Sequence, residues 1–302
     1  MGPALWKKQI GETLYAIRLI PIGGYCAMEG EDGGSDNPRS FDKAAWWKRF
    51  LILVAGAAMN FLVGVLLMIA IYLPMERAVV PVIDSFEPFS TVNGRDGLQD
   101  GDRILEVDGE KVFVQTDFSM LLKMYPSDTH DLVVRRDGKR VVLDDLLMEK
   151  HPVTYEDGST AMLYGMNFGI EDLSVGDRIV YGWNQCLDTI RMVRLSLKML
   201  LSGQAGIADM SGPVGIVQHM STVAEASPTK LDALLNMLYF GAFIAINLAV
   251  MNLLPIPALD GGRVVSLLLT TSAEAVTGKK LNPKYEGWIH GAGMILLLVI
   301  RL

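Results

Sequence analysis

The sequence of 302 residues is acidic and apolar, with a formal net charge of -7, 50% hydrophobic residues and a mean hydropathy of +0.30. A soluble protein of this length has a more polar composition, so we expect segments that cross a membrane. The acidic balance argues against a nucleic-acid-binding protein, which presents a basic face. The two cysteines, Cys26 and Cys186, are too few for a disulfide framework, and we interpret both as structural.

The first long apolar run extends from Phe50 to Leu73 and contains 24 residues without a charge. About 20 apolar residues suffice to cross the hydrocarbon core as a helix, so this run is predicted to span the membrane. Small side chains along a membrane helix let a second helix approach closely. The run contains four such residues, namely Gly56, Ala57, Ala58 and Gly64.

The segment after this helix is predicted to begin with a small β-rich domain. Alternating or apolar stretches at 79–84, 103–109, 131–138 and 139–146 are typical of short strands, and two Asp-Gly pairs provide turns between them. Residues 118–125 have helical spacing. Further along, residues 177–201 carry apolar side chains three or four positions apart, which predicts an amphipathic helix. That helix either lies on the membrane surface or packs on the β-rich domain.

The second apolar run, from Ala233 to Leu259, has 27 residues without a charge and contains Pro255 and Pro257 near its end. Proline cannot continue a regular helix, so the backbone must break there. Irregular backbone at membrane depth persists only where protein or a water-filled cavity covers it, which makes the break a natural place for chemistry. A third run at 287–300 has 14 residues, which is short for a span, so it is either an interfacial or re-entrant segment or a part of a span, and we expect the protein to continue past Leu302.

Basic residues flank the first run on its N-terminal side and the second run on its C-terminal side. Cytoplasmic loops are enriched in Lys and Arg, so both flanks are expected in the cytoplasm and the β-rich segment on the outer side. These residues are Lys7, Lys8, Arg18, Arg39, Lys43, Lys48 and Arg49 before the first run, and Arg263, Lys279, Lys280 and Lys284 after the second.

The segment from Asn252 to Gly262 reads N-L-L-P-I-P-A-L-D-G-G and matches the N-x-x-P-x-P-x-L-D-G pattern of the site-2 proteases at every fixed position. The chain resembles the bacterial branch of that family, which contains the regulator of sigma E protease, over nearly its whole length from Gly2 onward. Other similar stretches are 20–25 (the family's cytoplasmic β-hairpin), 37–41, 47–49, 55–60 (with Ala57 where many relatives have proline), 97–105 (a PDZ strand entry) and 211–216.

This resemblance implies a polytopic α-helical membrane protein with an inserted extracytoplasmic PDZ-like domain, of β-rich α+β type, and a cytoplasmic β-hairpin. It also implies a multi-pass protein of the bacterial inner or plasma membrane, surrounded by the lipid bilayer. The resulting regions are a cytoplasmic β-hairpin and loop (1–49), a transmembrane helix (50–73), a PDZ-like domain (75–150), an extracytoplasmic linker with the amphipathic helix (151–231), a transmembrane helix ending in the L-D-G motif (232–259), a cytoplasmic loop (260–286) and a partial transmembrane helix (287–302).

The resemblance further implies an intramembrane zinc endopeptidase, with Asp260 as one ligand of a catalytic Zn²⁺. Its expected substrates are single-span membrane proteins such as anti-sigma factors or signal-peptide remnants. Asn252 and Asn60 are each expected either to help hold an unwound substrate strand, as the resemblance suggests for Asn252, or to form hydrogen bonds between helices. Gly23 and Gly24 are either plain turn residues or part of an edge strand that pairs with substrate. The PDZ-like domain either binds an extended peptide ligand or excludes bulky substrates.

The family's other zinc ligands are two histidines of an H-E-x-x-H motif on a membrane helix, whose i and i+4 positions share one helix face. This sequence contains no such motif, because its histidines are His130, His151, His219 and His290 and none precedes a glutamate. We expect the missing helix to lie upstream of Met1, in a longer form of the protein. The alternatives are a non-catalytic membrane adaptor or pseudoprotease that binds peptides through its PDZ-like domain, and a half-protein that completes its site with a separately encoded partner.

Reading the gene for about a hundred codons upstream of Met1 tests this expectation, because one membrane helix needs about 20 residues plus its flanks. The expected result is an in-frame H-E-x-x-H on an apolar stretch. A stop codon with no such motif upstream would contradict the expectation and favour the adaptor, whereas the motif in a separate gene would favour the half-protein.

Overall fold

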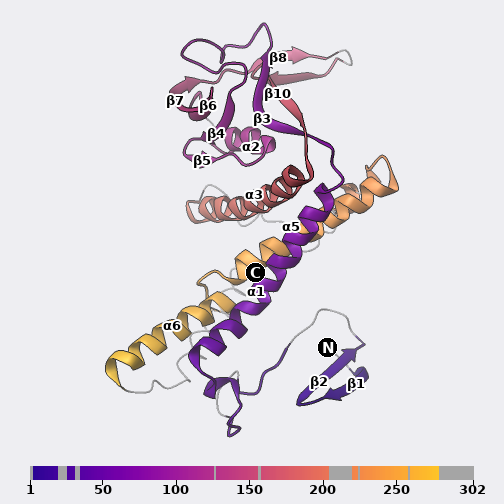
Figure 1. The fold of residues 1–302 in the computed structure, drawn as a ribbon, viewed down its shortest axis with the longest axis vertical. Coiled ribbons are helices and arrows are strands. Elements are labelled where there is room, and N and C mark those ends of the chain that lie inside the picture. The colour runs from indigo at the N-terminus through magenta and orange to yellow at the C-terminus, as the bar shows by residue number, and fades with distance from the viewer. Residues whose placement is uncertain are drawn as a thin grey trace. The chain divides into compact units, whose positions relative to one another are not determined.

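The structure is a computed structural model, and Figure 1 shows its fold as a ribbon. Two compact units make up the chain, the first from residues 1–54 and 255–302 and the second from residues 55–254. The structure describes residues 3–19, 26–30, 35–125, 127–155, 158–203, 220–223, 225–257 and 259–278.

The first unit contains a two-stranded antiparallel hairpin of β1 (Ala4–Ile10) and β2 (Thr13–Arg18). Its turn includes Gly11 at a φ of 61°, a conformation that glycine adopts without steric cost. The hairpin lies ahead of the one that the sequence analysis expected around Gly23 and Gly24, which falls outside the described residues. A short 3-10 helix, η1 (Phe41–Lys43), follows later in this unit.

The first unit also contains α6 (Asp260–Thr277), an 18-residue helix within the segment 260–286, where the sequence analysis placed a cytoplasmic loop and predicted no helix. It ends at Gly278, which has a left-handed φ of 65° and donates its N–H to the Glu274 carbonyl at 2.9 Å. The partial transmembrane helix expected at 287–302 lies outside the described residues.

Two helices are long and apolar enough to cross a membrane by their length and composition, α1 (Trp46–Tyr72) and α5 (Lys230–Asn252). They coincide with the two long apolar runs of the sequence. The N-terminus of α5 is capped by Thr229, whose hydroxyl accepts the N–H of Asp232 at 3.1 Å. The helix ends three residues before Pro255, as the two prolines predict.

Helices α1 and α5 pack closely where α1 has a glycine. A Cβ atom on Gly64 would meet Cγ1 of Ile246 at 2.5 Å and the carbonyl oxygen of Ala242 at 3.2 Å, so only glycine permits this approach. One turn further along α1, Met68 is buried in a cluster with Ala242 and Ile246. The small-residue pattern of the sequence therefore predicted a close contact that is present at Gly64, whereas Gly56 faces open space.

The second unit also contains a β domain, defined here as residues 77–172. Its larger sheet has the strand order β10-β3-β4-β6-β7, with β5 paired to β4, and all pairings are antiparallel. A two-stranded sheet of β8 and β9 lies within the same range. The elements are β3 (Arg77–Phe86), β4 (Arg103–Val107), β5 (Glu110–Lys111), α2 (Gln115–Met124), β6 (Thr129–Arg136), β7 (Lys139–Leu147), β8 (His151–Thr154), β9 (Thr160–Leu163) and β10 (Met166–Asp172).

Both Asp-Gly pairs form the turns expected of them. Asp108 and Gly109 have φ values of 50° and 78° between β4 and β5, and Asp137 and Gly138 have φ values of 48° and 76° between β6 and β7. Two successive residues with positive φ are typical of the type I′ turn, whose twist matches that of the flanking strands.

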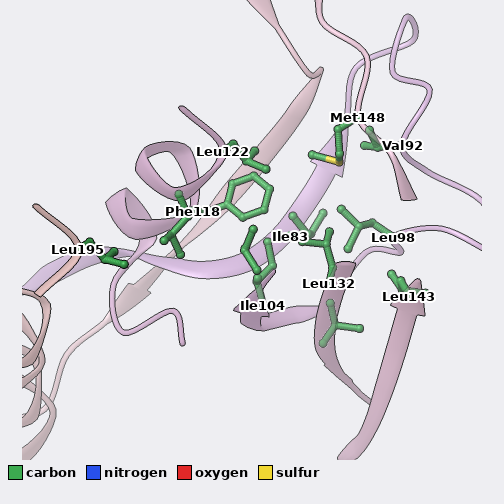
Figure 2. Packing of buried hydrophobic residues seen from close by; sticks show 13 residues of the cluster. Ile83, Val92, Leu98, Ile104, Phe118, Leu122, Leu132, Leu143, Met148 and Leu195 are labelled. Atoms are coloured by element: carbon green, nitrogen blue, oxygen red, sulfur yellow. The ribbon is translucent and has the colours of Figure 1, made fainter. Parts of the chain in front are cut away.

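One hydrophobic cluster forms the core of the β domain, and Figure 2 shows its side chains. Phe118 of α2 packs edge-on against Phe168 of β10, with ring centroids 5.6 Å apart. The cluster is completed by Leu195, which is 1% exposed and comes from α3 (Val175–Leu201), outside the β domain. The core of the β domain therefore includes part of a helix that follows it in the chain.

Helix α3 contacts α1 as well as the β domain. It begins at Ser174, whose side chain accepts the N–H of Asp177 at 3.3 Å. A Cβ atom on Gly182 would lie 2.9 Å from the Cα of Ile69, so the backbones of α3 and α1 touch there. Nearby, the rings of Tyr72 and Tyr181 meet edge-on with centroids 5.1 Å apart. The sequence left open whether this helix packs on the β domain or lies on the membrane surface. In the structure it packs on the β domain through Leu195.

Substitution of Gly64 by valine should separate α1 from α5, because the new side chain has no room beside Ile246. Overpacking of this kind costs about 1–3 kcal/mol of stability, so the midpoint of thermal unfolding in detergent should fall. The matched control is Gly56→Val on the same helix, where a Cβ meets nothing within 4 Å. Equal midpoints for the two variants would contradict the packing described here.

Candidate functional site

The candidate site lies at the break between the second apolar helix and α6. Asn252 is the last residue of α5. The N–H groups of Leu253 and Leu254 still donate to the carbonyls of Val250 and Met251, at 3.2 and 3.1 Å. Helical hydrogen bonding ends here because Pro255 has no N–H to donate. The chain thus leaves the helix within a few residues of the sequence motif that resembles the site-2 proteases.

Asp260 is the first residue of α6 and is half-buried. The preceding residue, Leu259, has an extended backbone with φ -102° and ψ 161°, and its carbonyl accepts the N–H of Arg263 at 3.2 Å. A carboxylate in the first turn of a helix interacts favourably with the positive end of the helix dipole. The Asp260 carboxylate is therefore carried by the first residue of a helix, whose backbone position is defined by the helix hydrogen bonds.

Gly262 makes the turn before α6 possible. A Cβ atom on this residue would lie 2.9 Å from the carbonyl carbon of Ile256 and 3.2 Å from the Cα of Pro257, both backbone atoms. The N–H of Leu259 also donates to the Ile256 carbonyl at 3.2 Å, which closes the turn. The segment from Pro255 to Leu259 consequently folds against the first turn of α6, and any side chain at position 262 would push it away.

The sequence analysis assigned no role to Gly262, although the residue belongs to the matched motif. The available signal was the second glycine directly after Asp-Gly, because paired glycines at a helix start often mark a close backbone approach. The paired glycines do not show which backbone segment approaches them. The contact with Ile256 depends on the path of the chain around the two prolines.

The remaining predicted site residues are distributed over the chain. Asn252 lies in the second unit and Asp260 in the first, joined by the segment 253–259. Asn60 lies within α1, in the second unit, and is half-buried. Gly23 and Gly24 lie outside the described residues, as does the segment 211–216.

An apolar groove lies between α3 and α5 in the second unit, with a volume of about 590 Å³. It reaches Leu254, the residue before Pro255. Two cations on its α3 side are engaged elsewhere, because Arg194 pairs with Glu110 and the Lys198 ammonium lies 5.7 Å from the ring centre of Tyr125. The lining residues are Ile190, Arg194, Leu197, Lys198, Ser202, Val250 and Leu254. The groove can therefore accept an apolar segment beside the C-terminal end of α5.

The described residues provide only part of a metal site. In the part of the chain that the structure describes, no three side chains of the His, Cys, Asp or Glu type gather to hold an ion. A catalytic zinc site needs three protein ligands, so Asp260 alone does not make one. Burial raises the pKa of the Cys186 thiol to about 11, which keeps this side chain protonated and makes it unsuitable as a ligand or nucleophile near neutral pH.

Comparison with known proteins gives a consistent result over the whole chain. The family model described as Peptidase family M50 matches residues 1–300. A protein of Clostridium acetobutylicum that carries the provisional name zinc metalloprotease is 31% identical, over 100% of this chain and 84% of its own length. The Regulator of sigma-W protease RasP of Bacillus subtilis is 31% identical over 87% of this chain and 59% of its own length. Zinc metalloprotease RasP of Geobacillus kaustophilus is 30% identical over 100% of this chain and 87% of its own length.

Replacing Gly262 by alanine should displace the turn at Ile256 and Pro257, because the added methyl group meets backbone atoms that cannot rotate away. We expect faster cleavage of the segment 253–259 in limited proteolysis of the purified protein, with sites mapped by mass spectrometry. The control is Gly241→Ala in α5, where a Cβ meets nothing within 4 Å. Unchanged proteolysis of the Gly262 variant would show that the turn does not depend on this contact.

Proposed function

The chain belongs to peptidase family M50, the site-2 proteases, and we propose that this zinc metalloprotease cleaves substrates whose own helices span the membrane. The observation that carries the proposal is the placement of the matched motif. A helix apolar enough to cross a membrane ends at Asn252, and two prolines prevent the helix from continuing. Asp260 is the first residue of the next helix. A carboxylate at the end of an apolar membrane helix costs free energy, because it is partly removed from water. Such residues in membrane proteins usually have a functional role.

Asp260 is proposed as one ligand of the zinc ion. Carboxylate oxygen is a regular zinc ligand, and the turn held by Gly262 fixes the backbone from which Asp260 projects. When bound in such a site, zinc supplies Lewis-acid polarisation of the scissile carbonyl and lowers the pKa of a coordinated water. The described residues contribute this single ligand and the shape of the break.

Asn252 is proposed to bind the main chain of an unwound substrate. An intact substrate helix keeps its carbonyls in internal hydrogen bonds, so a peptide bond must be released before it can be attacked. An amide side chain can donate to one backbone group and accept from another, which suits this task. Asn60, in the middle of α1, is proposed for the same role. Gly23 and Gly24 are proposed to belong to an edge strand that pairs with the extended substrate.

The groove between α3 and α5 is proposed to hold the apolar part of the substrate. Its lining is largely aliphatic and it reaches Leu254, directly before the break. A substrate segment that has left a lipid environment would keep apolar contacts in such a groove.

The β domain is proposed to be PDZ-like and to lie on the outer side of the bacterial membrane in a multi-pass protein. Its G-L-Q-D-G-D segment forms a tightly anchored loop. Asp102 is fully buried and its carboxylate accepts hydrogen bonds from Arg136 at 2.8 and 2.6 Å and from the N–H of Gln99 at 2.9 Å. Such a domain would either bind an extended peptide by strand addition or exclude bulky outer domains of the substrate.

The proposed substrates are single-span membrane proteins, such as anti-sigma factors or signal-peptide remnants. Support for the first class comes from the Bacillus subtilis relative, whose name describes a regulator of sigma-W protease. Proteins of both classes present one apolar helix to the membrane, and apolar side chains of such a segment would find aliphatic partners in the groove.

Asp260→Asn should lower zinc content and abolish cleavage of a single-span model substrate, because the amide oxygen is a weaker zinc ligand than a carboxylate. Zinc is measured by mass spectrometry of the metal in protein purified from the gene as it is encoded, including any coding sequence before Met1. The control is Asp172→Asn, an exposed carboxylate of the β domain that pairs with Arg77 at 2.8 Å. Full zinc content and full activity in the Asp260 variant would disprove the ligand role.

The second candidate function is a non-catalytic membrane adaptor that binds peptides through the β domain. It is favoured by the packed hydrophobic core of that domain, which gives a peptide-binding surface a rigid support. The same assay separates the two functions. If the unsubstituted gene product neither holds zinc nor cleaves the model substrate, the adaptor is the better description of this chain.

A further inference from the structure

A buried ionic cluster joins α3 to the β domain. Its centre is Arg191 of α3, whose side chain is 4% exposed. One of its terminal nitrogens lies 2.8 Å from the carboxylate of Asp117 in α2, which is 1% exposed, and the same nitrogen also pairs with Asp188, one turn earlier on α3. Ionic groups are rarely buried unless each one is paired, so the arrangement of charges at this junction is restricted.

Arg191 also holds the strand before α2. It donates to the carbonyl of Lys111, and its guanidinium lies 5.3 Å from the ring centre of Phe113. The neighbouring pair of Arg194 and Glu110 and the amide of Asn184, which donates to the Phe113 carbonyl at 3.5 Å, extend the junction along α3. The β domain is thus attached to α3 through the segment 110–117.

The two carboxylates of the cluster have different surroundings. Asp117 accepts the N–H groups of Phe113 and Val114 at 2.5 and 2.9 Å. Asp188 has a hydrogen bond to Asp117 and faces the same guanidinium. Burial, followed by the charge of Asp117, raises the pKa of Asp188 to about 7. When both carboxylates are ionised, two negative charges share one positive charge in a buried place.

The other titratable groups near the two carboxylates stay neutral up to pH 8.5, because tyrosine ordinarily titrates near about pH 10 and burial raises the pKa of the Cys186 thiol to about 11. They are Tyr72 of α1, Tyr181 and Cys186 of α3, and Tyr239 of α5. The cluster therefore gains or loses its net charge through the two carboxylates alone.

We propose that this cluster is a pH-responsive latch between the β domain and α3, closed when Asp117 and Asp188 hold one proton between them and loosened when that proton leaves. In the closed state, the shared proton and Arg191 together neutralise the carboxylates. After the proton leaves, an uncompensated negative charge remains in the junction, and hydration by opening relieves it. The proton resides on Asp188, because burial and the neighbouring charge of Asp117 raise the pKa of the Asp188 carboxyl.

The direction of the pH effect follows from the folded and unfolded pKa values of Asp188. The junction raises this pKa from 3.8 to about 7, so the folded form binds more protons than the unfolded form between these values. The stabilisation is fully present below pH 3.8 and is lost as the pH rises through about 7. The latch is therefore closed at pH 5.5 and loosened at pH 8.5.

The latch acts on the proposed substrate path because α3 has two roles. Its residues near Arg191, including Ile190 and Arg194, line the groove against α5. Loosening the β domain frees the face of α3 that carries Leu195, and with it the outer wall of that groove. This consequence rests on the proposed role of the groove, whereas the latch itself does not.

Hydrogen exchange of the 302-residue chain in detergent, followed by mass spectrometry at pH 5.5, 7.0 and 8.5, tests the latch. Exchange times are corrected for the intrinsic pH dependence of amide exchange. We expect protection of 110–117 to fall about tenfold between pH 5.5 and 8.5 after this correction. In Asp188→Asn, a neutral side chain replaces the protonated acid, and protection should stay high at every pH.

The matched control is Asp172→Asn, which should keep the pH dependence of the unsubstituted protein. Protection of 110–117 that does not change with pH in the unsubstituted protein would overturn the latch, and this result needs no variant to fold. A pH dependence that persists in Asp188→Asn would overturn the assignment of the proton to this pair. Neither result depends on zinc or on cleavage, so failure of the proposed function would leave the test intact.

Discussion

Helix α3 has to satisfy two surfaces at once, and the second unit of the protein depends on this constraint. At Gly182 its backbone touches the backbone of α1 at Ile69, where no side chain is available to absorb a shift. Two turns later Arg191 is buried against the β domain, and one turn beyond that Leu195 enters the core of that domain. Because both contacts lie on one continuous helix, Val175–Leu201, the position of α3 has to satisfy them together.

The two contacts of α3 differ in the kind of interaction that forms them. Contact at Gly182 is made by shape, and it is insensitive to pH or salt. The contact at Arg191 is made by charges that have lost water, and such groups stabilise a structure only when every one is matched. Helix α3 therefore meets α1 through an apolar contact, and it meets the β domain through both the ionic cluster and Leu195, which packs in the core of that domain.

Much of the fold could be predicted from the sequence, because its signals are local. The apolar runs that became α1 and α5, the proline break and the Asp-Gly turns at 108–109 and 137–138 each depend on neighbouring residues. Strand β10 was missed because it pairs with β3, about 80 residues earlier, and its own residues alternate weakly. The cluster of Asp117, Asp188 and Arg191 was missed because charges on an amphipathic helix usually face water, and only packing shows that these do not.

The same distinction applies to the candidate site. The L-P-I-P-A-L-D-G-G segment predicts where the candidate site lies, but its residue types do not show how the chain passes from α5 to α6. Two prolines stop α5, and each removes a backbone donor, so the turn has to be stabilised by other means. The hydrogen bond from the Leu259 N–H to the Ile256 carbonyl provides that stabilisation. Gly262 has no side chain, which leaves room for the backbone of Ile256 and Pro257. The residues of the motif therefore act together on the backbone. The prolines end the preceding helix, and Gly262 permits the close turn that sets the backbone position of Asp260.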